Sequence, residues 1–286
     1  MVRNDGTSPP ADRLLKDPPS LRSHIQQALQ AVSEGPRPVW DETRPEDHGM
    51  SVVVFLMGLQ HTTCDQPPEP CLIFNKRSRK VRQPGDICCP GGGVAPRFDR
   101  WVAELLRLPL SPLRRWSYYP YWRKRSPEQL ARLRLLMATA LREGFEEMRL
   151  NPLAVTFQGM LPPEKLVLFR RTIVPMVAWV GGQRRFVPNW EVEKIVRIPV
   201  RDLLAPRGYA RVRLQMDSPK AGMRAGAQEF PAFRHRSREG SEILWGATYR
   251  ITMNFLETVF GFRAPPPGGS EVIEKRLTSN YLTGQG

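Results

Sequence analysis

The sequence predicts an α/β (α+β) fold in which helices pack on a mixed sheet. Two apolar segments rich in β-branched residues open its central part, SVVVFLMGL at residues 51–59 and CLIFNKR at residues 71–77. A long helical pattern follows, and after it come three more β-rich segments and a closing helical stretch. Strands, helix, strands and helix in this order are typical of a sheet covered by helices.

Size and composition set the broad class. The chain has 286 residues, of which 41% are hydrophobic and 25% charged, which suits one large domain or one domain with appendages. No apolar run approaches the roughly 18 residues of a membrane span, and the first residues lack the apolar core of a secretory signal. We therefore expect a cytoplasmic protein. The four cysteines lack the paired spacing of a zinc site, so we expect buried thiols.

We expect three regions along the chain. Residues 1–48 are polar and contain prolines, apart from a short helical pattern, and predict an N-terminal arm or accessory helix. Residues 49–262 hold the predicted strands and helices and form the main domain. Residues 263–286 begin with a Pro/Gly run that breaks regular structure, so we expect a flexible C-terminal tail.

Local patterns place the remaining elements. A short strand at residues 86–89 runs into the glycine turn PGGG. Beyond the long helix we expect strands at TFQGML, LFRRTIVPMVAWVG and EKIVRIPV, a short helix at RDLL and a last helix over residues 247–259.

The long helix is expected to begin at Ser126. This residue is a suitable N-cap, Pro127 suits the first helical position, and Gln129 would close a capping box. One face of the helix is apolar, with Leu136 as an exception; its members are Leu130, Leu133, Met137, Ala140, Leu141, Gly144 and Met148.

The other face of this helix carries REGFEEM, residues 142–148. At 100° per residue, Glu143, Glu146 and Glu147 point to one side of a helical turn, where like charges repel. A solvated acidic face is the plain interpretation. A divalent metal ion would remove the conflict, and clusters of carboxylate oxygens select Mg²⁺ or Mn²⁺. The helix therefore resembles a metal platform, with Arg142 as a counter-charge or phosphate contact.

The net charge of +15 suits nucleic acid, an anionic membrane surface or a phosphorylated small molecule. Basic residues gather at residues 100–136 and 207–238, around the acidic REGFEEM. An acidic centre in basic surroundings suits an enzyme that holds a metal ion and attracts a polyphosphate. The four histidines, His24, His48, His61 and His235, have no metal or triad spacing, and we treat them as structural.

The glycine turn is informative only together with the residues that follow it. Gly91, Gly92 and Gly93 let the backbone approach a ligand closely, although a glycine triplet after a strand is often a plain turn. PGGG, then Asp99, then REGFEEM and Leu150 resemble the Nudix box, G-x5-E-x7-R-E-U-x-E-E-x-G-U. Asp99 stands at the first glutamate of the box and Arg149 at its last glycine. About 35 extra residues separate the loop from the helix.

Three further stretches resemble the coenzyme A pyrophosphatase-like branch of the Nudix hydrolases. They span residues 72–92, 188–204 and 244–257 and occur in the order of that branch. The segment associated with coenzyme A departs from the branch pattern: Gln83 replaces a histidine, Asp86 replaces Gln or Glu, and Cys89 replaces an aromatic residue. The resemblance implies the Nudix α/β/α sandwich with a mixed sheet and a helical insertion, at about residues 100–136, inside the box.

The resemblance also implies an activity and a set of site residues. It implies Mg²⁺- or Mn²⁺-dependent hydrolysis of the pyrophosphate bond of a nucleoside diphosphate linked to another moiety. Coenzyme A or acyl-CoA is favoured, giving 3′,5′-ADP and (acyl-)4′-phosphopantetheine. The implied metal ligands are Glu143, Glu146, Glu147 and the Gly92 carbonyl, while Arg142 pairs with a carboxylate; either Glu143 or a residue outside the box is the base. The implied substrate-binding residues are Arg77, Ser78, Arg79, Lys80, Arg82, Gly91 and Gly92.

Several alternatives stay open on the sequence alone. The basic loop of residues 77–82 can grip the 3′-phosphate of coenzyme A or be a solvated hairpin. ADP-ribose-like compounds, dinucleoside polyphosphates, or nucleotide and RNA binding without turnover are the alternative functions. The aromatic and basic insertion can pack on the domain, form a lid, contact RNA or join a homodimer.

Overall fold

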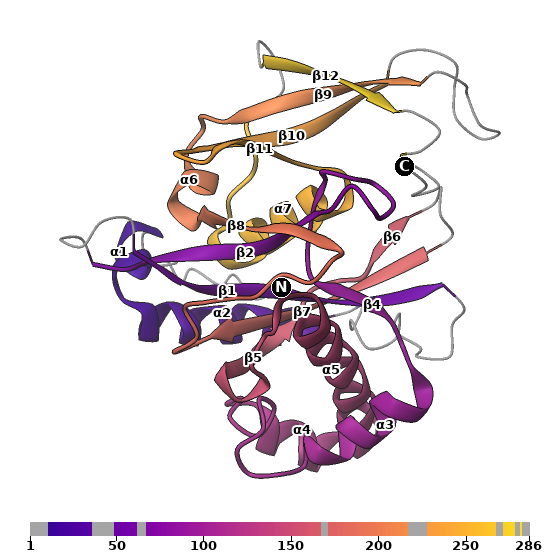
Figure 1. The fold of residues 1–286 in the computed structure, drawn as a ribbon. Helices are drawn as coiled ribbons and strands as arrows, with labels where there is room; N and C mark the ends of the chain where they lie inside the picture. The colour runs from indigo at the N-terminus through magenta and orange to yellow at the C-terminus, as the bar shows by residue number, and fades with distance from the viewer. Residues whose placement is uncertain are drawn as a thin grey trace.

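The computed structural model describes residues 11–35, 49–61, 67–166, 171–216, 228–266, 271–277 and 281. A central mixed sheet runs through the middle of this part of the chain (Figure 1). Its middle strand β1 (Met50–Gln60) is antiparallel to β2 (Glu69–Arg77) and parallel to β7 (Arg171–Val180). The order along the sheet is β3-β2-β1-β7-β5, with β3 (Ile87–Cys88) and β5 (Val155–Met160) at its ends.

Three short or peripheral strands complete the central sheet. β4 (Gly91–Gly93) pairs with β1, β6 (Glu164–Leu166) pairs with β7, and β8 (Val192–Pro199) pairs with β2. These pairings place the glycine turn directly beside the middle strand. The strands expected at TFQGML, at LFRRTIVPMVAWVG and at EKIVRIPV correspond to β5, β7 and β8.

The sheet has helices on both faces because the side chains of β1 alternate in direction. Val52, Val54 and Leu56 enter the core beneath α5 (Pro127–Met148). Val53, Phe55 and Met57 enter the opposite core, which contains α7 (Gly246–Phe260) and α2 (Pro18–Ser33). The predicted α/β/α sandwich with a mixed sheet is therefore confirmed. The smaller helices α1 (Ala11–Lys16) and α6 (Val200–Leu204) also join the second core.

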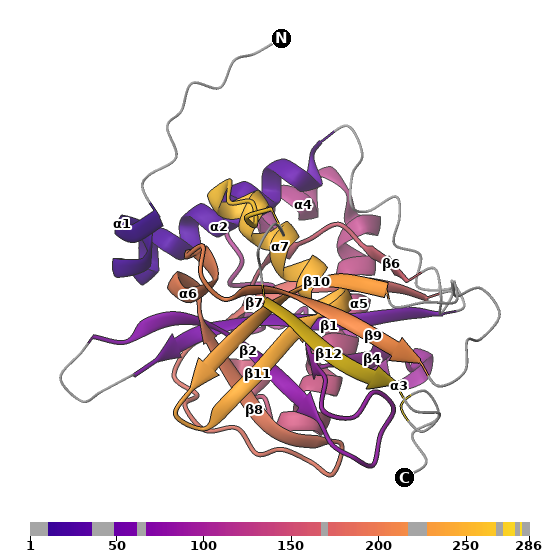
Figure 2. The same cartoon turned by 90° about the horizontal axis from the view of Figure 1, so that it is seen from above.

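A second sheet, which the sequence did not predict, covers the far side of α7 (Figures 1 and 2). Its order is β11-β10-β9-β12, made by β9 (Tyr209–Met216), β10 (Gln228–Ser237), β11 (Gly240–Trp245) and β12 (Glu271–Leu277). The basic run expected at residues 207–238 supplies its first two strands. Their arginines alternate with apolar residues such as Val212 and Leu214, which face a small core of their own.

The expectation of a flexible tail over residues 263–286 is wrong for two of its parts. Glu271–Leu277 forms β12, which pairs in parallel with β9. Tyr281 is buried, and its hydroxyl donates a hydrogen bond to Asp86. The prediction failed because it used the local Pro/Gly composition alone. Pairing with the distant strand β9 orders residues 271–277, and local composition does not show such pairing.

The insertion is helical, as expected, and half of its aromatic residues pack inward. It contains α3 (Pro96–Leu105), α4 (Tyr119–Arg125) and the first turns of α5. The rings of Trp116 and Phe157 have centroids 5.0 Å apart, and the indole of Trp122 donates to Gln30 over 2.9 Å. The insertion thus extends the core beneath the central sheet, between α5 and α2.

Two details of α5 differ from the sequence prediction. Ser126 precedes the helix, but its side chain makes no capping hydrogen bond, so the predicted capping box is absent. Leu136 is fully buried because α3 and α4 cover a part of the helix surface that the wheel left to solvent. The helix ends at Arg149, whose φ of 55° is the left-handed conformation usual for the glycine of a helix terminus. None of the helices in the described residues has the length and hydropathy to cross a membrane.

Candidate active site

The last turns of α5 pack directly against the glycine turn, which lies beside β1 in the sheet. Gly91 and Gly92 pair with Val53 and Val52 of the middle strand. A β-carbon on Gly92 would overlap the carboxylate of Glu143, and one on Gly91 would overlap the backbone of β1. Only glycine fits at Gly91, while at Gly92 a larger residue would displace Glu143, so this turn is a close contact between loop, strand and helix rather than a plain loop.

Arg142 ties the glycine turn, α3 and α5 together. Its Nε lies 2.8 Å from Asp99 Oδ1, and its Nη2 donates to the carbonyl of Gly93 over 2.9 Å. Nη1 lies 2.9 Å from Glu143 Oε1 and 3.2 Å from Glu146 Oε2. Burial alone would lower the pKa of Arg142, but the hydrogen bond with Asp99 and the nearby carboxylates raise it above its ordinary value. The guanidinium therefore stays charged and holds the site together.

Asp99 is the carboxylate partner of Arg142 that the sequence left unnamed. Its side chain is fully buried and also accepts hydrogen bonds from the Ala95 amide and the Thr139 hydroxyl, each at 2.7 Å. The insertion separates Asp99 from Arg142 along the chain, yet α3 folds back against α5 and brings the two side chains into contact. Asp99, which the sequence aligns with the first glutamate of the box pattern, thus forms a buried ion pair with Arg142.

Glu147 is the most perturbed acid of the site. It is 9% exposed, and its Oε2 accepts a hydrogen bond of 2.6 Å from the amide of Asn75 on β2. Burial and the charge of Glu143 raise the pKa of Glu147 to about 8. Burial also raises the pKa of Glu143, which is partly offset by Arg142 beside it. The two carboxylates repel each other in a setting that excludes much of the water.

Glu146 does not join this pair. Its side chain is 52% exposed and turns to Arg142, one helical turn earlier. Within the described residues, no three histidine, cysteine or acidic side chains come close enough together to form a ready metal cluster. The expected grouping of Glu143, Glu146 and Glu147 is therefore not assembled in this geometry, because Arg142 draws Glu146 aside.

The residues present nevertheless fit a hard divalent cation. Glu143 and Glu147 supply carboxylate oxygens that crowd each other, and a cation between them would remove that cost. Next to Glu147, Asn75 Oδ1 is buried and has no hydrogen-bond partner in the structure. An unsatisfied buried oxygen of this kind suits a ligand or its hydration shell.

A polar cleft of about 530 Å³ begins on the other side of the glycine turn. Of the seven residues expected to bind substrate, Arg77 and Gly91 line it. Arg79, Lys80 and Arg82 are exposed on the loop between β2 and β3, outside its lining, and Ser78 is half-buried there. Arg77 also donates to the carbonyl of Arg82 over 2.6 Å. The structure therefore separates the expected basic loop into one cleft residue and an outer cationic rim.

Most of the cleft comes from residues that sequence reasoning did not single out. Arg171 and Arg250 add positive charge, and Phe230, Trp245 and Tyr281 add aromatic surface. They come from β7, α7, the second sheet and the C-terminal segment. Trp245 and Arg250 had a usable signal, since both lie in the stretch of residues 244–257 that resembles the coenzyme A branch; Arg171, Phe230 and Tyr281 depend on tertiary contacts.

Asp86 closes one end of this cleft. It is buried and accepts a hydrogen bond from Trp245 Nε1 over 3.0 Å, and it also contacts Lys275 Nζ and the Tyr281 hydroxyl. The sequence marked Asp86 as a departure from the branch pattern. The structure gives this departure a physical role, because the carboxylate fastens the C-terminal segment over the cleft.

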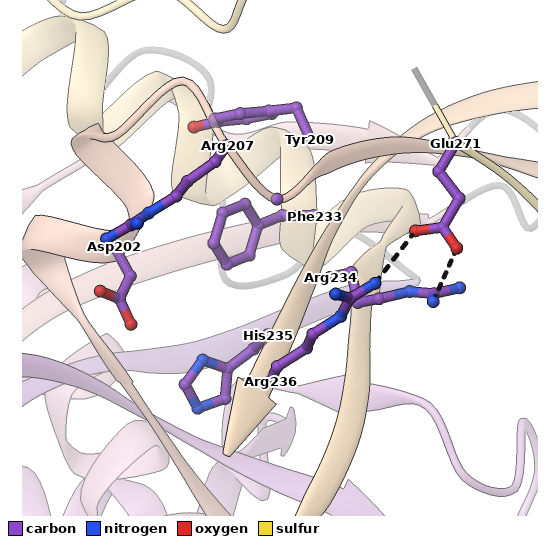
Figure 3. A pocket seen from close by; sticks show the side chains of 9 residues that line it. Asp202, Arg207, Tyr209, Phe233, Arg234, His235, Arg236 and Glu271 are labelled. Atoms are coloured by element: carbon purple, nitrogen blue, oxygen red, sulfur yellow. Dashed lines mark ion pairs between the residues drawn. The ribbon is translucent and has the colours of Figure 1, made fainter.

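A second, basic cleft of about 450 Å³ lies at the second sheet, away from REGFEEM (Figure 3). Arg207, Arg234 and Arg236 line it, and Glu271 pairs with Arg234 at 2.8 Å and with Arg236 at 3.7 Å. It also contains His235, which is 7% exposed. The cleft has no pair of crowded carboxylates, so its chemistry is that of anion binding rather than metal-assisted hydrolysis.

No family model matches the chain. One curated relative, the uncharacterised Nudix hydrolase NudL of Pectobacterium atrosepticum, is 28% identical over 144 residues. The chain is thus similar to a Nudix hydrolase over half of its length. The match covers 50% of this chain and 56% of the relative, so the chain spans little more than half the length of that protein.

Similar solved structures are Nudix proteins as well. An Enterococcus faecalis MutT/nudix family protein has a TM-score of 0.39 at 11% identity, over 87% of this chain and 76% of that one. A C. elegans Ap4A hydrolase has a TM-score of 0.34 at 11% identity, over 55% of this chain and 84% of that one. The Nudix domain of Shewanella oneidensis NrtR, in complex with ADP ribose, has a TM-score of 0.32 at 13% identity, over 61% of this chain and 84% of that one. These scores are low, and the sandwich is established by the strand order and layers of the chain itself.

Proposed function

We propose that this protein is a metal-dependent diphosphatase, which hydrolyses the pyrophosphate bond of a nucleoside diphosphate linked to another moiety. The observation that carries the proposal is the pair of carboxylates beside the glycine turn, the buried Glu147 and the half-buried Glu143. Burial raises the pKa of both carboxylates, and the charge of Glu143 raises that of Glu147 further; such perturbed acids mark functional sites. A cation bound there would turn the repulsion into attraction.

Glu143, Glu147 and the backbone of Gly92 would hold Mg²⁺ or Mn²⁺, with Glu146 at the rim. The bound ion supplies a Lewis acid that neutralises diphosphate oxygens and acidifies a water molecule. The chain itself fixes the geometry. Asn75 orients Glu147, the absence of a side chain at Gly92 leaves room for Glu143, and Arg142 locks the turn to α5.

The polar cleft supports a nucleotide as the substrate. Arg77 and Arg171 can contact phosphates, and the aromatic surface of Phe230 and Trp245 can stack on a base. Coenzyme A or acyl-CoA is the favoured substrate, giving 3′,5′-ADP and (acyl-)4′-phosphopantetheine. The exposed Arg79, Lys80 and Arg82 would then meet the 3′-phosphate at the rim. ADP-ribose-like compounds and dinucleoside polyphosphates are the next candidates.

The test is a hydrolysis assay with Mg²⁺ or Mn²⁺ and a panel of coenzyme A, 3′-dephospho-coenzyme A, ADP-ribose and a dinucleoside polyphosphate, followed by chromatography. We expect cleavage that EDTA abolishes and that Glu147→Gln and Glu146→Gln each reduce by at least about 100-fold, while circular dichroism stays unchanged. Full activity of both variants would contradict the assignment of these carboxylates. Turnover of another compound in place of coenzyme A would keep the reaction and change the substrate.

The basic cleft of Figure 3 favours a second candidate function, the binding of RNA without turnover. Arg207 and Arg236 could contact successive phosphates, and such binding weakens steeply with salt. Fluorescence anisotropy of a labelled single-stranded RNA, titrated at two salt concentrations, measures this. Tight binding that Arg207→Glu and Arg236→Glu remove, together with silence across the hydrolysis panel, would favour this candidate over the diphosphatase.

A further inference from the structure

The insertion forms an apolar groove that the diphosphatase proposal does not use. It measures about 900 Å³ and lies between α3, the loop after it, α5 and the 3₁₀ helix η2 (Pro152–Ala154). Its walls are almost wholly apolar and include Phe98, Leu105, Leu108, Leu110, Phe145 and Leu153. This volume lies within the range of small-molecule sites, roughly 300–1,000 Å³, which are mostly apolar with a few polar groups.

These apolar side chains remain largely exposed. Phe98 is 52% exposed, Leu153 is 64% exposed and Leu110 is 73% exposed. The core of the insertion is made by other residues, among them Leu113 and Trp116, which are buried. A continuous exposed apolar surface of this kind marks a binding site on a water-soluble fold.

The groove meets the candidate active site along α5. The only charged side chains in its lining are Arg142 and Glu146, which form an ion pair at the edge of the site. Arg142 also bonds to Gly93 of the glycine turn. The polar cleft begins at Gly91 on the α7 side of the sheet, whereas the groove lies on the α5 side. A diphosphate bound through a cation at Glu143 and Glu147 would therefore have a polar recess on one side and an apolar one on the other.

We propose that the groove binds the hydrocarbon chain of the substrate. On this proposal, which rests on the proposed diphosphatase function, the substrate is a nucleoside diphosphate whose second substituent carries a long aliphatic chain. The nucleotide occupies the cleft of Arg77 and Trp245, and the chain lies along Phe98, Phe145 and Leu153. The continuity of the groove with Arg142 and Glu146 favours a substrate chain over a second protein molecule or a membrane, neither of which needs to reach catalytic carboxylates.

The test compares two matched substrate pairs: coenzyme A with dodecanoyl-coenzyme A, and the methyl ester of ADP with its dodecyl ester, all below micellar concentrations. We expect KM to be at least 10-fold lower for the long-chain member of a hydrolysed pair. The variant Leu110→Gln/Leu153→Gln should bring the ratio of the two KM values close to one. Leu59→Gln, a change at a 38% exposed leucine outside the groove, should leave the ratio as in the wild type.

A binding measurement separates the groove from the diphosphatase function. The two ADP esters are titrated into the Glu147→Gln variant by calorimetry, with and without the groove substitutions. Tighter binding of the dodecyl ester that the groove substitutions remove supports the groove even if no compound of the panel is hydrolysed. Hydrolysis with equal KM values for both chain lengths would overturn the groove proposal and leave the diphosphatase intact. So would self-association or vesicle binding that the groove substitutions abolish without any effect of chain length.

Discussion

At the scale of single residues, the contact between Gly92 and Glu143 gives the sharpest expectation. Gly92→Ala would push the Glu143 carboxylate away from the turn, whereas a β-carbon on Gly93 meets nothing within 4 Å. A displacement of about 1 Å in a catalytic group costs on the order of 100-fold in rate. We expect Gly92→Ala to lower kcat/KM by that order in a steady-state assay, with Gly93→Ala close to the wild type. Equal losses in the two variants would contradict the proposed contact.

His235 gives a prediction about pH. Burial lowers its pKa below the ordinary value of 6.5, with the charges of Asp202 and Glu242 opposing this effect and Lys194 adding to it. The unfolded chain therefore binds a proton at a higher pH than the folded one, so the free energy of unfolding falls as the pH drops below 6.5. Urea titrations between pH 7.5 and 5 measure the free energy of unfolding. We expect it to decrease less toward low pH in the variant His235→Gln than in the wild type. An equal decrease in the free energy of unfolding with pH in variant and wild type would contradict this role of His235.

At the scale of elements, the insertion divides into a packed half and an exposed half. Trp116 is 3% exposed and packs on Phe157, whereas Trp101 on α3 is 61% exposed. Trp116→Ala should lower the free energy of unfolding by about 3–5 kcal/mol because it leaves a cavity in the core. Trp101→Ala should change it by less than about 0.5 kcal/mol. Urea denaturation of both variants measures the difference, and similar losses would show that the insertion does not share the core.

The same element shows why the site could be only partly predicted. The pattern of α5 gave its apolar face and placed the three glutamates on one turn, which the structure reproduces. It could not show that Arg142 would draw Glu146 away from the other two, since the choice between a metal cluster and an ion pair depends on rotamers. Nor could it show that Asn75, from a distant strand, would hold Glu147.

At the scale of the whole molecule, the C-terminal segment is tied to the polar cleft through Asp86. Tyr281→Phe removes a hydrogen bond to a buried carboxylate, which typically costs about 1–3 kcal/mol of stability. We expect that loss in urea denaturation, together with a higher KM for any nucleotide substrate, because Tyr281 also lines the cleft. Tyr118→Phe is the matched control on the insertion. If both variants behaved alike, the segment would not contribute to the cleft.

Sequence periodicity and a short motif determined much about this protein. The apolar, β-branched segment that forms β1, the apolar stripe of α5 and the order of elements predicted the sandwich, and PGGG, Asp99 and REGFEEM carried the resemblance to the Nudix box. These features are local, because side-chain direction in a strand or a helix follows from backbone geometry alone. Local features of this kind were enough to predict the fold and the residues of the acidic turn of α5.

Tertiary structure alone decided the rest. The second sheet, the strand Glu271–Leu277 and the cleft beneath Tyr281 arise from pairings between segments far apart in the chain. The burial that raises the pKa of Glu147 and the groove that opens beside Arg142 likewise depend on which elements meet. Strand partners, burial and cavities are properties of contacts between distant residues, and their free energies do not appear in any local pattern.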